Sequence, residues 1–332
     1  MKKIIFSPIN SLFTAAALLA CSAPVFAELP TFPLNDEFTT STNETVSVTD
    51  WTPNVINSTG VWNIVGDMAQ VNWYYEGWYR DFLRGEGTIN LGSDTQGGVL
   101  YIMGSNPPPD ENVYNLWFDF AGTINVERKG QFTLGGSYHS HYGTIFSIGT
   151  LNINGGTVSV LSETANSSYF RIKNLTVRDG GKLESALSLT TASGGKWNLH
   201  SAGGVVSSLL RVSSGTFTLN LLGENALSGL PRLSFDENTG TNFRINVSAN
   251  NSIETLELNG NATLGLYVAD GATLKIENLA SKSNAQSLTD VTFVFYDYSA
   301  DSVLFGVSDI RVEDNRLYIP SIGTFVNLVA YD

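Results

Sequence analysis

The chain has 332 residues and a formal net charge of -13 at pH 7. A surface this acidic repels phosphate backbones, so nucleic acid is excluded as an expected partner. The single cysteine, Cys21, excludes a disulfide framework, and no thiolate metal site can be built from it. A content of 32 glycines with only 15% charged residues is typical of an extracellular all-β protein.

Residues 1–27 have the pattern of a secretory signal. Lys2 and Lys3 precede an apolar run that ends in Val25-Phe26-Ala27, which predicts cleavage after Ala27. As an alternative, Leu18-Leu19-Ala20-Cys21 resembles a bacterial lipoprotein box and would leave Cys21 as a lipidated first residue. The run is too short to be retained as a transmembrane helix. We therefore expect an exported protein at the cell surface, outer membrane or outside the cell, with a periplasmic protein or a lipoprotein as alternatives.

Two segments of different composition follow the signal. Residues 28–50 are polar and contain Pro30 and Pro33, which predicts an extended lead-in. Residues 51–120 hold five of the six tryptophans and predict an aromatic cap or the first coils of a repeat fold. These aromatic residues have two interpretations. In the first, they belong to a core or to a cap over the end of the repeats. In the second, some of them form a sugar-stacking platform, for which the candidates are Trp73, Tyr74, Trp78 and Tyr79.

A short phrase recurs through the middle of the chain: glycine, then Thr or Lys, then an apolar, a polar and another apolar residue. Copies begin at Gly87, Gly122, Gly130, Gly149, Gly156, Gly181, Gly195 and Gly215, and Ala262 and Ala272 begin two more with alanine in place of glycine. Apolar and polar residues that alternate predict a strand with one buried face, and glycine marks the turn before it. Each copy is therefore interpreted as a turn followed by a strand.

So short a strand cannot bury its apolar side alone, and the copies must stack on one another. We expect Leu151, Ile153, Val158 and Val160 to lie in the shared core. The uneven steps between copies suit coils of roughly 20 residues with two or three strands each. The predicted fold is all-β, a right-handed parallel β-helix over residues 121–290, with residues 291–332 as a C-terminal cap.

The interruptions of the pattern predict loops that leave the stack, at residues 163–168, 223–232 and 248–252. Asp179-Gly180-Gly181 and Asp270-Gly271-Ala272 occupy equivalent places between strands. We interpret both as Asp-Gly turns and not as calcium sites, because the dense glycine and aspartate nonapeptides of calcium β-rolls are absent.

The copies NINGGTVSV, NLTVRDGGKLES and ADGATLKIENL resemble the passenger segments of bacterial autotransporters, over roughly residues 85–290. The resemblance implies a parallel β-helix that is displayed on a cell surface. The chain departs from that family because no part of it resembles the translocating barrel. Periplasmic release, another secretion route and a truncated gene are therefore all left open.

Two groups of residues are candidates for a catalytic or metal-binding role. Arg171-Ile172-Lys173 resembles the RIK element of polygalacturonase-type hydrolases, which implies contact with an acidic sugar, but the paired carboxylates needed for glycoside hydrolysis have no counterpart in this sequence. His139 and His141 would share one face of a strand, yet no third ligand accompanies them. We expect no catalytic residue, metal or cofactor.

The prediction for function is a non-enzymatic surface protein that adheres to glycans or to other molecules of a cell surface. Two alternatives stay open, a polysaccharide-acting lyase or hydrolase and a purely structural component of the surface.

Overall fold

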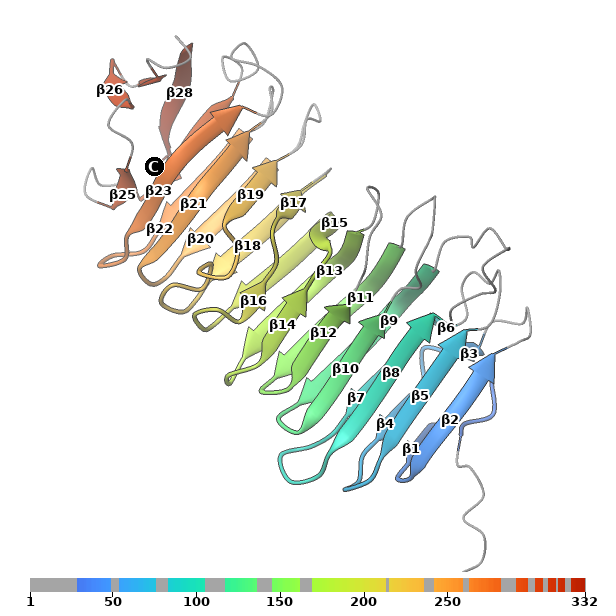
Figure 1. The fold of residues 1–332 in the computed structure, drawn as a ribbon. Coiled ribbons are helices and arrows are strands. Elements are labelled where there is room, and N and C mark those ends of the chain that lie inside the picture. The colour runs from blue at the N-terminus through green and yellow to red at the C-terminus, as the bar shows by residue number, and fades with distance from the viewer. Residues whose placement is uncertain are drawn as a thin grey trace, which may run out of the picture.

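The computed structural model describes residues 29–48, 54–75, 83–104, 117–135, 145–161, 169–212, 215–235, 242–258, 263–281, 291–297, 302–306, 310–314, 316–319 and 324–331. Figure 1 shows an elongated molecule in which the strands lie side by side and stack along the long axis. The chain forms a parallel β-solenoid of about 8 turns, so the predicted fold class is confirmed. Among the described residues no helix is long and apolar enough to cross a membrane.

One side of the solenoid is a sheet of seven parallel strands, which we call the small sheet. Its strands, in order along the axis, are β2 (Asn43–Val48), β5 (Gln70–Tyr75), β8 (Gly98–Gly104), β10 (Gly130–Gly135), β12 (Thr157–Leu161), β14 (Lys182–Ser185) and β16 (Val205–Val206).

The rest of the solenoid wall is a sheet of nineteen strands, which we call the large sheet, together with the pair β3 (Asn54–Ile56) and β6 (Leu83–Gly85). The first strands of the large sheet are β1 (Glu37–Thr40), β4 (Val61–Ile64), β7 (Thr88–Leu91), β9 (Trp117–Glu127), β11 (Ile145–Asn154), β13 (Tyr169–Arg178) and β15 (Ser188–Leu199).

The four long strands β9, β11, β13 and β15 each cover two sides of the coil. A register irregularity divides them, between Ile148 and Thr150 in β11 and between Ile172 and Asn174 in β13. Beyond β15 the two halves are separate strands. The first side, formed by the first halves of the long strands, continues in β17 (Leu210–Val212), β19 (Arg232–Phe235) and the last residues of β21 (Asn251–Leu258) and β23 (Leu274–Ser281). The second side, formed by their second halves, continues in β18 (Phe217–Leu221), β20 (Asn242–Val247), β22 (Thr263–Val268) and β24 (Thr292–Tyr296). The first residues of β21 and β23 pair with each other and with β25 (Val303–Phe305), and they form a third side.

The copies of the glycine phrase separate into two groups. Those at Gly87, Gly122, Gly149 and Gly195 begin second-side strands or half-strands, and those at Gly130, Gly156 and Gly181 lie at the start of strands of the small sheet. The short steps between copies therefore separate two strands of one coil, and the long steps separate coils. This arrangement confirms the prediction that each coil contains two or three strands.

Alternation directs one residue in two into the coil, where identical or similar side chains stack on one another. On the second side the inner row consists of Trp62, Ile89, Ile124, Leu151, Leu175, Trp197, Leu219, Ile245, Leu266 and Phe295, which are all buried. Leu151, Ile153, Val158 and Val160 are buried as predicted. Full burial of each such side chain contributes about 1.5–3 kcal/mol, so the stability is distributed along the axis.

The glycine that opens a copy is required by close approach between coils. A Cβ on Gly149 would lie 1.8 Å from the carbonyl oxygen of Ala121 in the preceding coil, and a Cβ on Gly122 would lie 2.2 Å from that of Gly87. Real atoms never come so near, so a side chain here would force neighbouring coils apart.

The solenoid begins earlier than the sequence indicated. Residues 28–50, predicted as an extended lead-in, contain β1 and β2, which pair in register with β4 and β5. The polar composition misled because the outer positions of these strands face solvent. Their inner positions hold Thr40 and Glu44, two buried polar residues that hide the apolar period.

One predicted loop is also wrong. Residues 223–232 do not leave the stack, because Ala226, Leu227 and Leu230 are buried in the core. This segment follows the end of the small sheet at β16. Asn251 fastens it, since the backbone N–H of Ala226 donates to Asn251 Oδ1 (2.7 Å) and Asn251 Nδ2 donates to the carbonyl oxygen of Gly223 (3.0 Å).

The C-terminal end changes strand direction. β24 still pairs in parallel with β22 and with β28 (Thr324–Tyr331), but β27 (Arg316–Ile319) runs antiparallel to β28 and to β26 (Arg311–Glu313). Residues 291–332, predicted as a cap, thus contribute both final parallel strands and an antiparallel hairpin. Leu317, Ile319 and Val326 of the hairpin are buried against the core.

Replacement of Gly149 by alanine should lower the thermal unfolding midpoint, because its Cβ would overlap a backbone oxygen that cannot rotate away. Overpacking of this kind costs about 1–3 kcal/mol. The matched control is Gly97→Ala, whose Cβ would meet nothing nearer than the carbonyl oxygen of Gly66 at 3.4 Å. Circular dichroism melts of both variants test the expectation, and equal midpoints would contradict it.

Candidate functional site

The outer face of the second side carries two parallel rows of short polar side chains. We call them the asparagine row and the threonine row. The asparagine row is Asn63, Asn90, Asn125, Asn152, Thr176, Asn198, Asn220 and Asn246, and the threonine row is Thr88, Thr123, Thr150, Asn174, Lys196, Thr218 and Arg244. Members of a row are register partners in successive strands, so they recur at about 4.8 Å along the axis.

The amides of the asparagine row are hydrogen-bonded to one another in one direction. The Nδ2 of each donates to the Oδ1 of the residue one coil earlier: Asn90 to Asn63 (2.7 Å), Asn125 to Asn90 (2.8 Å), Asn152 to Asn125 (2.8 Å), Asn220 to Asn198 (2.7 Å) and Asn246 to Asn220 (2.7 Å). Asn63 begins the ladder by donating to Glu37 Oε1 (2.7 Å), and Asn198 donates to Thr176 Oγ1 at 3.4 Å.

This ladder fixes the orientation of the amides and still leaves hydrogen-bonding capacity. An amide has two N–H donors and an oxygen with two lone pairs. The ladder uses one N–H and one lone pair of each inner asparagine. The second N–H and the second lone pair are not used by it. Except for Asn220, which is buried, the asparagines are half-buried, so a ligand laid on the face can reach them.

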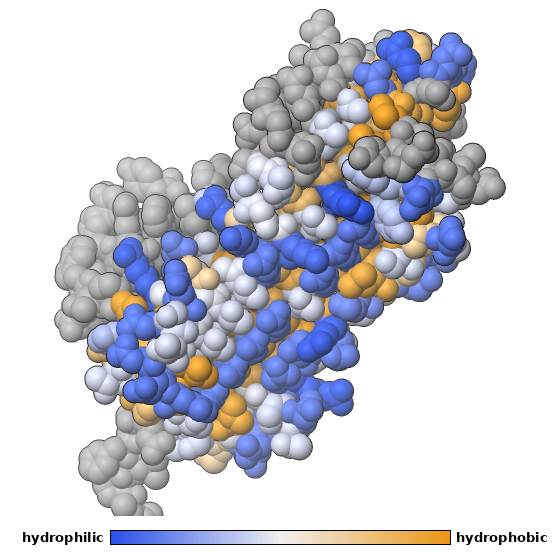
Figure 2. Space-filling view, turned by 180° about the vertical axis from the view of Figure 1, so that it is seen from behind, coloured by the Kyte–Doolittle hydropathy of each residue, from blue (hydrophilic) through white to orange (hydrophobic). Residues whose placement is uncertain are grey.

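Figure 2 shows the molecule from behind, where hydrophilic side chains run as a band along the long axis. The strand register places the asparagine row and the threonine row along this same axis. The result is a surface whose pattern repeats from coil to coil rather than a pocket.

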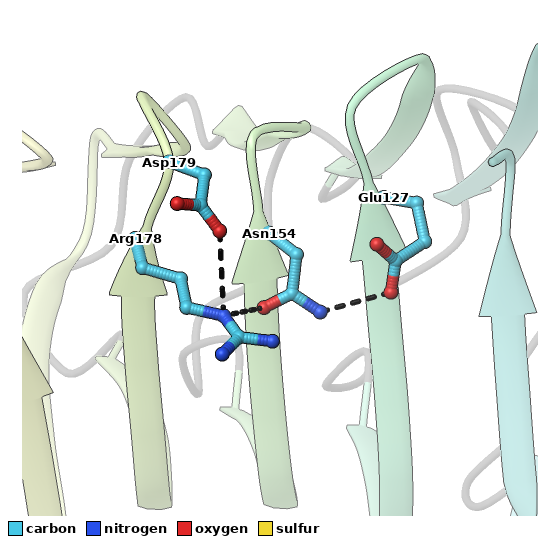
Figure 3. A network of polar contacts seen from close by, with 4 residues as sticks. All are labelled: Glu127, Asn154, Arg178 and Asp179. Atoms are coloured by element: carbon cyan, nitrogen blue, oxygen red, sulfur yellow. Dashed lines mark hydrogen bonds and ion pairs between the residues drawn. The ribbon is translucent and has the colours of Figure 1, made fainter. Parts of the chain in front are cut away.

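A second polar network lies at the end of the long strands. Asn154 Nδ2 donates to Glu127 Oε1 (2.8 Å), Arg178 Nε donates to Asn154 Oδ1 (2.8 Å), and the same nitrogen lies 3.5 Å from Asp179 Oδ2 (Figure 3). Asp179 has a φ of 57° and Gly180 a φ of 81°, which fits the predicted Asp-Gly turn. The two acids offset the charge of Arg178, so this network is structural.

Near the C-terminal end the asparagine row is continued by aromatic residues. Tyr267 and Tyr296 are the next register partners after Asn246. The guanidinium of Arg244 lies 5.6 Å from the ring centre of Tyr267 and 4.9 Å from that of Tyr296, and Arg244 Nε donates to Asn246 Oδ1 (2.5 Å). The sequence patterns did not indicate this group.

The predicted sugar platform is not assembled as expected. Trp73 is only 2% exposed and packs inside the coil against Trp62, with ring centres 5.8 Å apart, so its assignment to the platform is wrong. Alternation along β5 explains this, because it places Trp73 inward and Tyr74 outward, and Tyr74 is 39% exposed. Trp78 and Tyr79 lie outside the described residues.

The other sequence candidates are placed as follows. Arg171 stacks on Tyr169, with its guanidinium 5.0 Å from the ring centre, and donates to the tyrosine hydroxyl at 3.1 Å. Lys173 is exposed at the irregularity that divides β13. His139 and His141 lie outside the described residues. Within the described ranges no group of three His, Cys, Asp or Glu residues could hold a metal ion.

The asparagine row has a signal in the sequence that is concealed when all copies of the glycine phrase are taken as one set. In the second-side copies at Gly87, Gly122, Gly149 and Gly195 the polar place of the phrase is always asparagine. In the small-sheet copies at Gly130 and Gly156 it is Thr133 and Ser159. The copy at Gly215 also precedes a second-side strand but has Thr218 at this place, so the polar residue separates most of the copies and not all of them.

Comparison of the chain with protein-family models, with curated proteins and with solved structures finds no match.

Replacement of Asn125 by alanine should lower stability by about 1–2 kcal/mol, because it removes the hydrogen bond to Asn90 and leaves Asn152 without its acceptor. Asn125→Thr should cost less, since Thr176 already occupies this row and accepts from Asn198. Denaturant midpoints of the two variants measure the difference. An alanine variant as stable as the native chain would show that the ladder contributes nothing.

Proposed function

We propose that the protein is an exported, non-enzymatic contact protein that binds extended glycans through the outer face of its second side. The observation that carries this proposal is the pair of rows, in which hydrogen-bonding groups recur at every strand in a fixed orientation. A polymer of sugars presents hydroxyl groups with a similar periodicity, so one chain laid along the axis can form the same contact in many coils.

The binding energy of such a face is the sum of many small terms. One hydrogen bond across the face contributes only about 0.5–1.5 kcal/mol. Several coils that act together on one polymer raise the affinity by effective concentration, without a deep pocket. The ladder supports this, because side chains that are already ordered lose less conformational entropy on binding.

Export is part of the proposal and rests on residues 1–27, whose pattern is that of a secretory signal. The resemblance to autotransporter passengers agrees with display at a bacterial surface, and the β-solenoid fold is the part of that resemblance that the structure shows. Adhesion to the glycans of a neighbouring cell or of a matrix is the role that suits these features.

The test uses the mature chain from residue 28 on a glycan array, followed by affinity electrophoresis in gels that contain the best polysaccharide. The variant Thr88→Val/Thr123→Val removes two adjacent hydroxyls of the threonine row and keeps β-branched side chains. Two lost hydrogen bonds of about 1 kcal/mol each should weaken binding at least about tenfold.

The matched control is Thr45→Val/Thr157→Val, which removes two outward hydroxyls from the small sheet. It should bind as the native chain does. Equal loss in both variants would assign binding to another part of the surface, and no binding to any glycan would contradict the proposal. Release of reducing ends or unsaturated products from the bound polysaccharide would show instead a polysaccharide-acting enzyme.

A further inference from the structure

The centre of this acidic chain is basic. Residues 169–212 contain six basic residues, Arg171, Lys173, Arg178, Lys182, Lys196 and Arg211, against two acidic ones, Asp179 and Glu184. A formal excess of four positive charges thus lies within a chain of net charge -13. Arg178 pairs with Asp179 and is linked to Glu127 through Asn154, and Lys182 lies on the small sheet two residues before Glu184. Arg171, Lys173, Lys196 and Arg211 lie on the large sheet.

On the first side the positive charges recur at every second strand. Arg171 of β13 is the register partner of Thr190 in β15, and Thr190 is the partner of Arg211 in β17. Because adjacent strands are about 4.8 Å apart, the Cα atoms of the two arginines lie roughly 10 Å apart along the axis. Tyr169 supports the guanidinium of Arg171 from the side.

The second side repeats the same pattern within the threonine row. Lys196 of β15 is the partner of Thr218 in β18, and Thr218 is the partner of Arg244 in β20. A cation, a threonine and a second cation therefore follow one another on both sides. Lys173 lies where the two sides meet, at the register irregularity between Ile172 and Asn174 that divides β13. Lys196, Arg211 and Arg244 are exposed and Arg171 is half-exposed.

Acidic residues mark the ends of the first-side series. Asp119 precedes Arg171 by two strands through Ser147, and Glu257 follows Arg211 by two strands through Ser234. Glu257 is largely buried and is paired with Arg232. The positive segment is thus limited to the middle coils, which sets the length of polymer that it can hold.

From this arrangement we propose that the middle coils bind a linear anionic polysaccharide, carboxylated or sulfated, laid along the solenoid axis where the two sides of the large sheet meet. The inference rests on the proposed glycan contact and names its chemical class. The regular interval between cations fits a polymer whose acidic groups recur at a fixed spacing. On the second side the half-buried Thr218 can donate to a hydroxyl between them, whereas Thr190 on the first side is buried and donates to the carbonyl oxygen of Thr191. In a chain that is acidic elsewhere, such a segment also orients the incoming polyanion.

The test measures binding of polygalacturonate and of chondroitin sulfate by affinity electrophoresis and by calorimetry. The variant Arg171→Gln/Arg211→Gln removes the first-side cations, and Lys196→Gln/Arg244→Gln removes those of the second side. Each should weaken binding of the acidic polymers about tenfold or more. Binding by the native chain should fall steeply as NaCl is raised, because the contacts are screened.

The control variant is Lys182→Gln/Lys275→Gln. It removes the same number of charges, one from the small sheet and one that pairs with Glu277 at 3.2 Å. The native affinity should be retained. Equal loss in this control would show a simple dependence on net charge and would overturn the inference. Unchanged circular dichroism spectra and melting midpoints exclude unfolding as the cause of any loss.

Further probes separate this inference from the proposed function. Neutral glycans that bind as tightly as the acidic polymers, with no effect of the four cation replacements, would overturn the anionic class and leave the glycan contact standing. Duplex DNA or phosphatidylglycerol vesicles that bind more tightly than either acidic polysaccharide would show a different partner and overturn the inference. The cation variants could lose binding of the acidic polymers while Thr88→Val/Thr123→Val has no effect. That result would support the binding site in the middle coils and would contradict the proposed glycan contact along the whole threonine row.

Discussion

The other features depend on one constraint: each coil stacks on the next with its strands parallel and in register. Because neighbours are parallel and in register, a residue at one place in a coil meets its counterpart in the next. Inward places therefore become columns of aliphatic and aromatic side chains, such as the run from Ile89 through Leu151 to Ile245. Outward places become rows of like polar groups. The backbone oxygens beside Gly122 and Gly149 show how closely the coils approach.

Because of the same constraint, one polar side chain in each coil is repeated along the axis and forms an extended surface. A single exposed asparagine contributes little, but in this row the asparagines are bonded in two runs, from Asn63 to Asn152 and from Asn198 to Asn246, with Thr176 between them. Where the row passes to Tyr267 and Tyr296, Arg244 maintains the contact by stacking on both rings. A face of this type suits a periodic partner better than a compact one, which is why the proposals concern polymers.

The sequence predicted the type of fold well, because glycine and the alternation of apolar and polar residues are local signals that survive in every copy. It could not predict which residues line up along the axis. The hydrogen-bonded asparagines are separated by 27, 35, 27, 22 and 26 positions, and this irregularity conceals the row. Nor could it decide the facing of Trp73, since aromatic residues at successive places in β5 obscure the alternation. The prediction of a loop at residues 223–232 was wrong because the turn residues of this segment outweighed Ala226, Leu227 and Leu230.

The reversal of direction at β27 has a consequence for association between molecules. An array of parallel strands can in principle be extended by any chain that offers another strand of the same direction, and natural proteins guard against this at their sheet edges. In this protein β27 occupies the outer edge of β28 in the opposite direction. β26 covers β27 in turn, so a second copy arriving end to end cannot pair directly with β28, the last parallel strand of the second side.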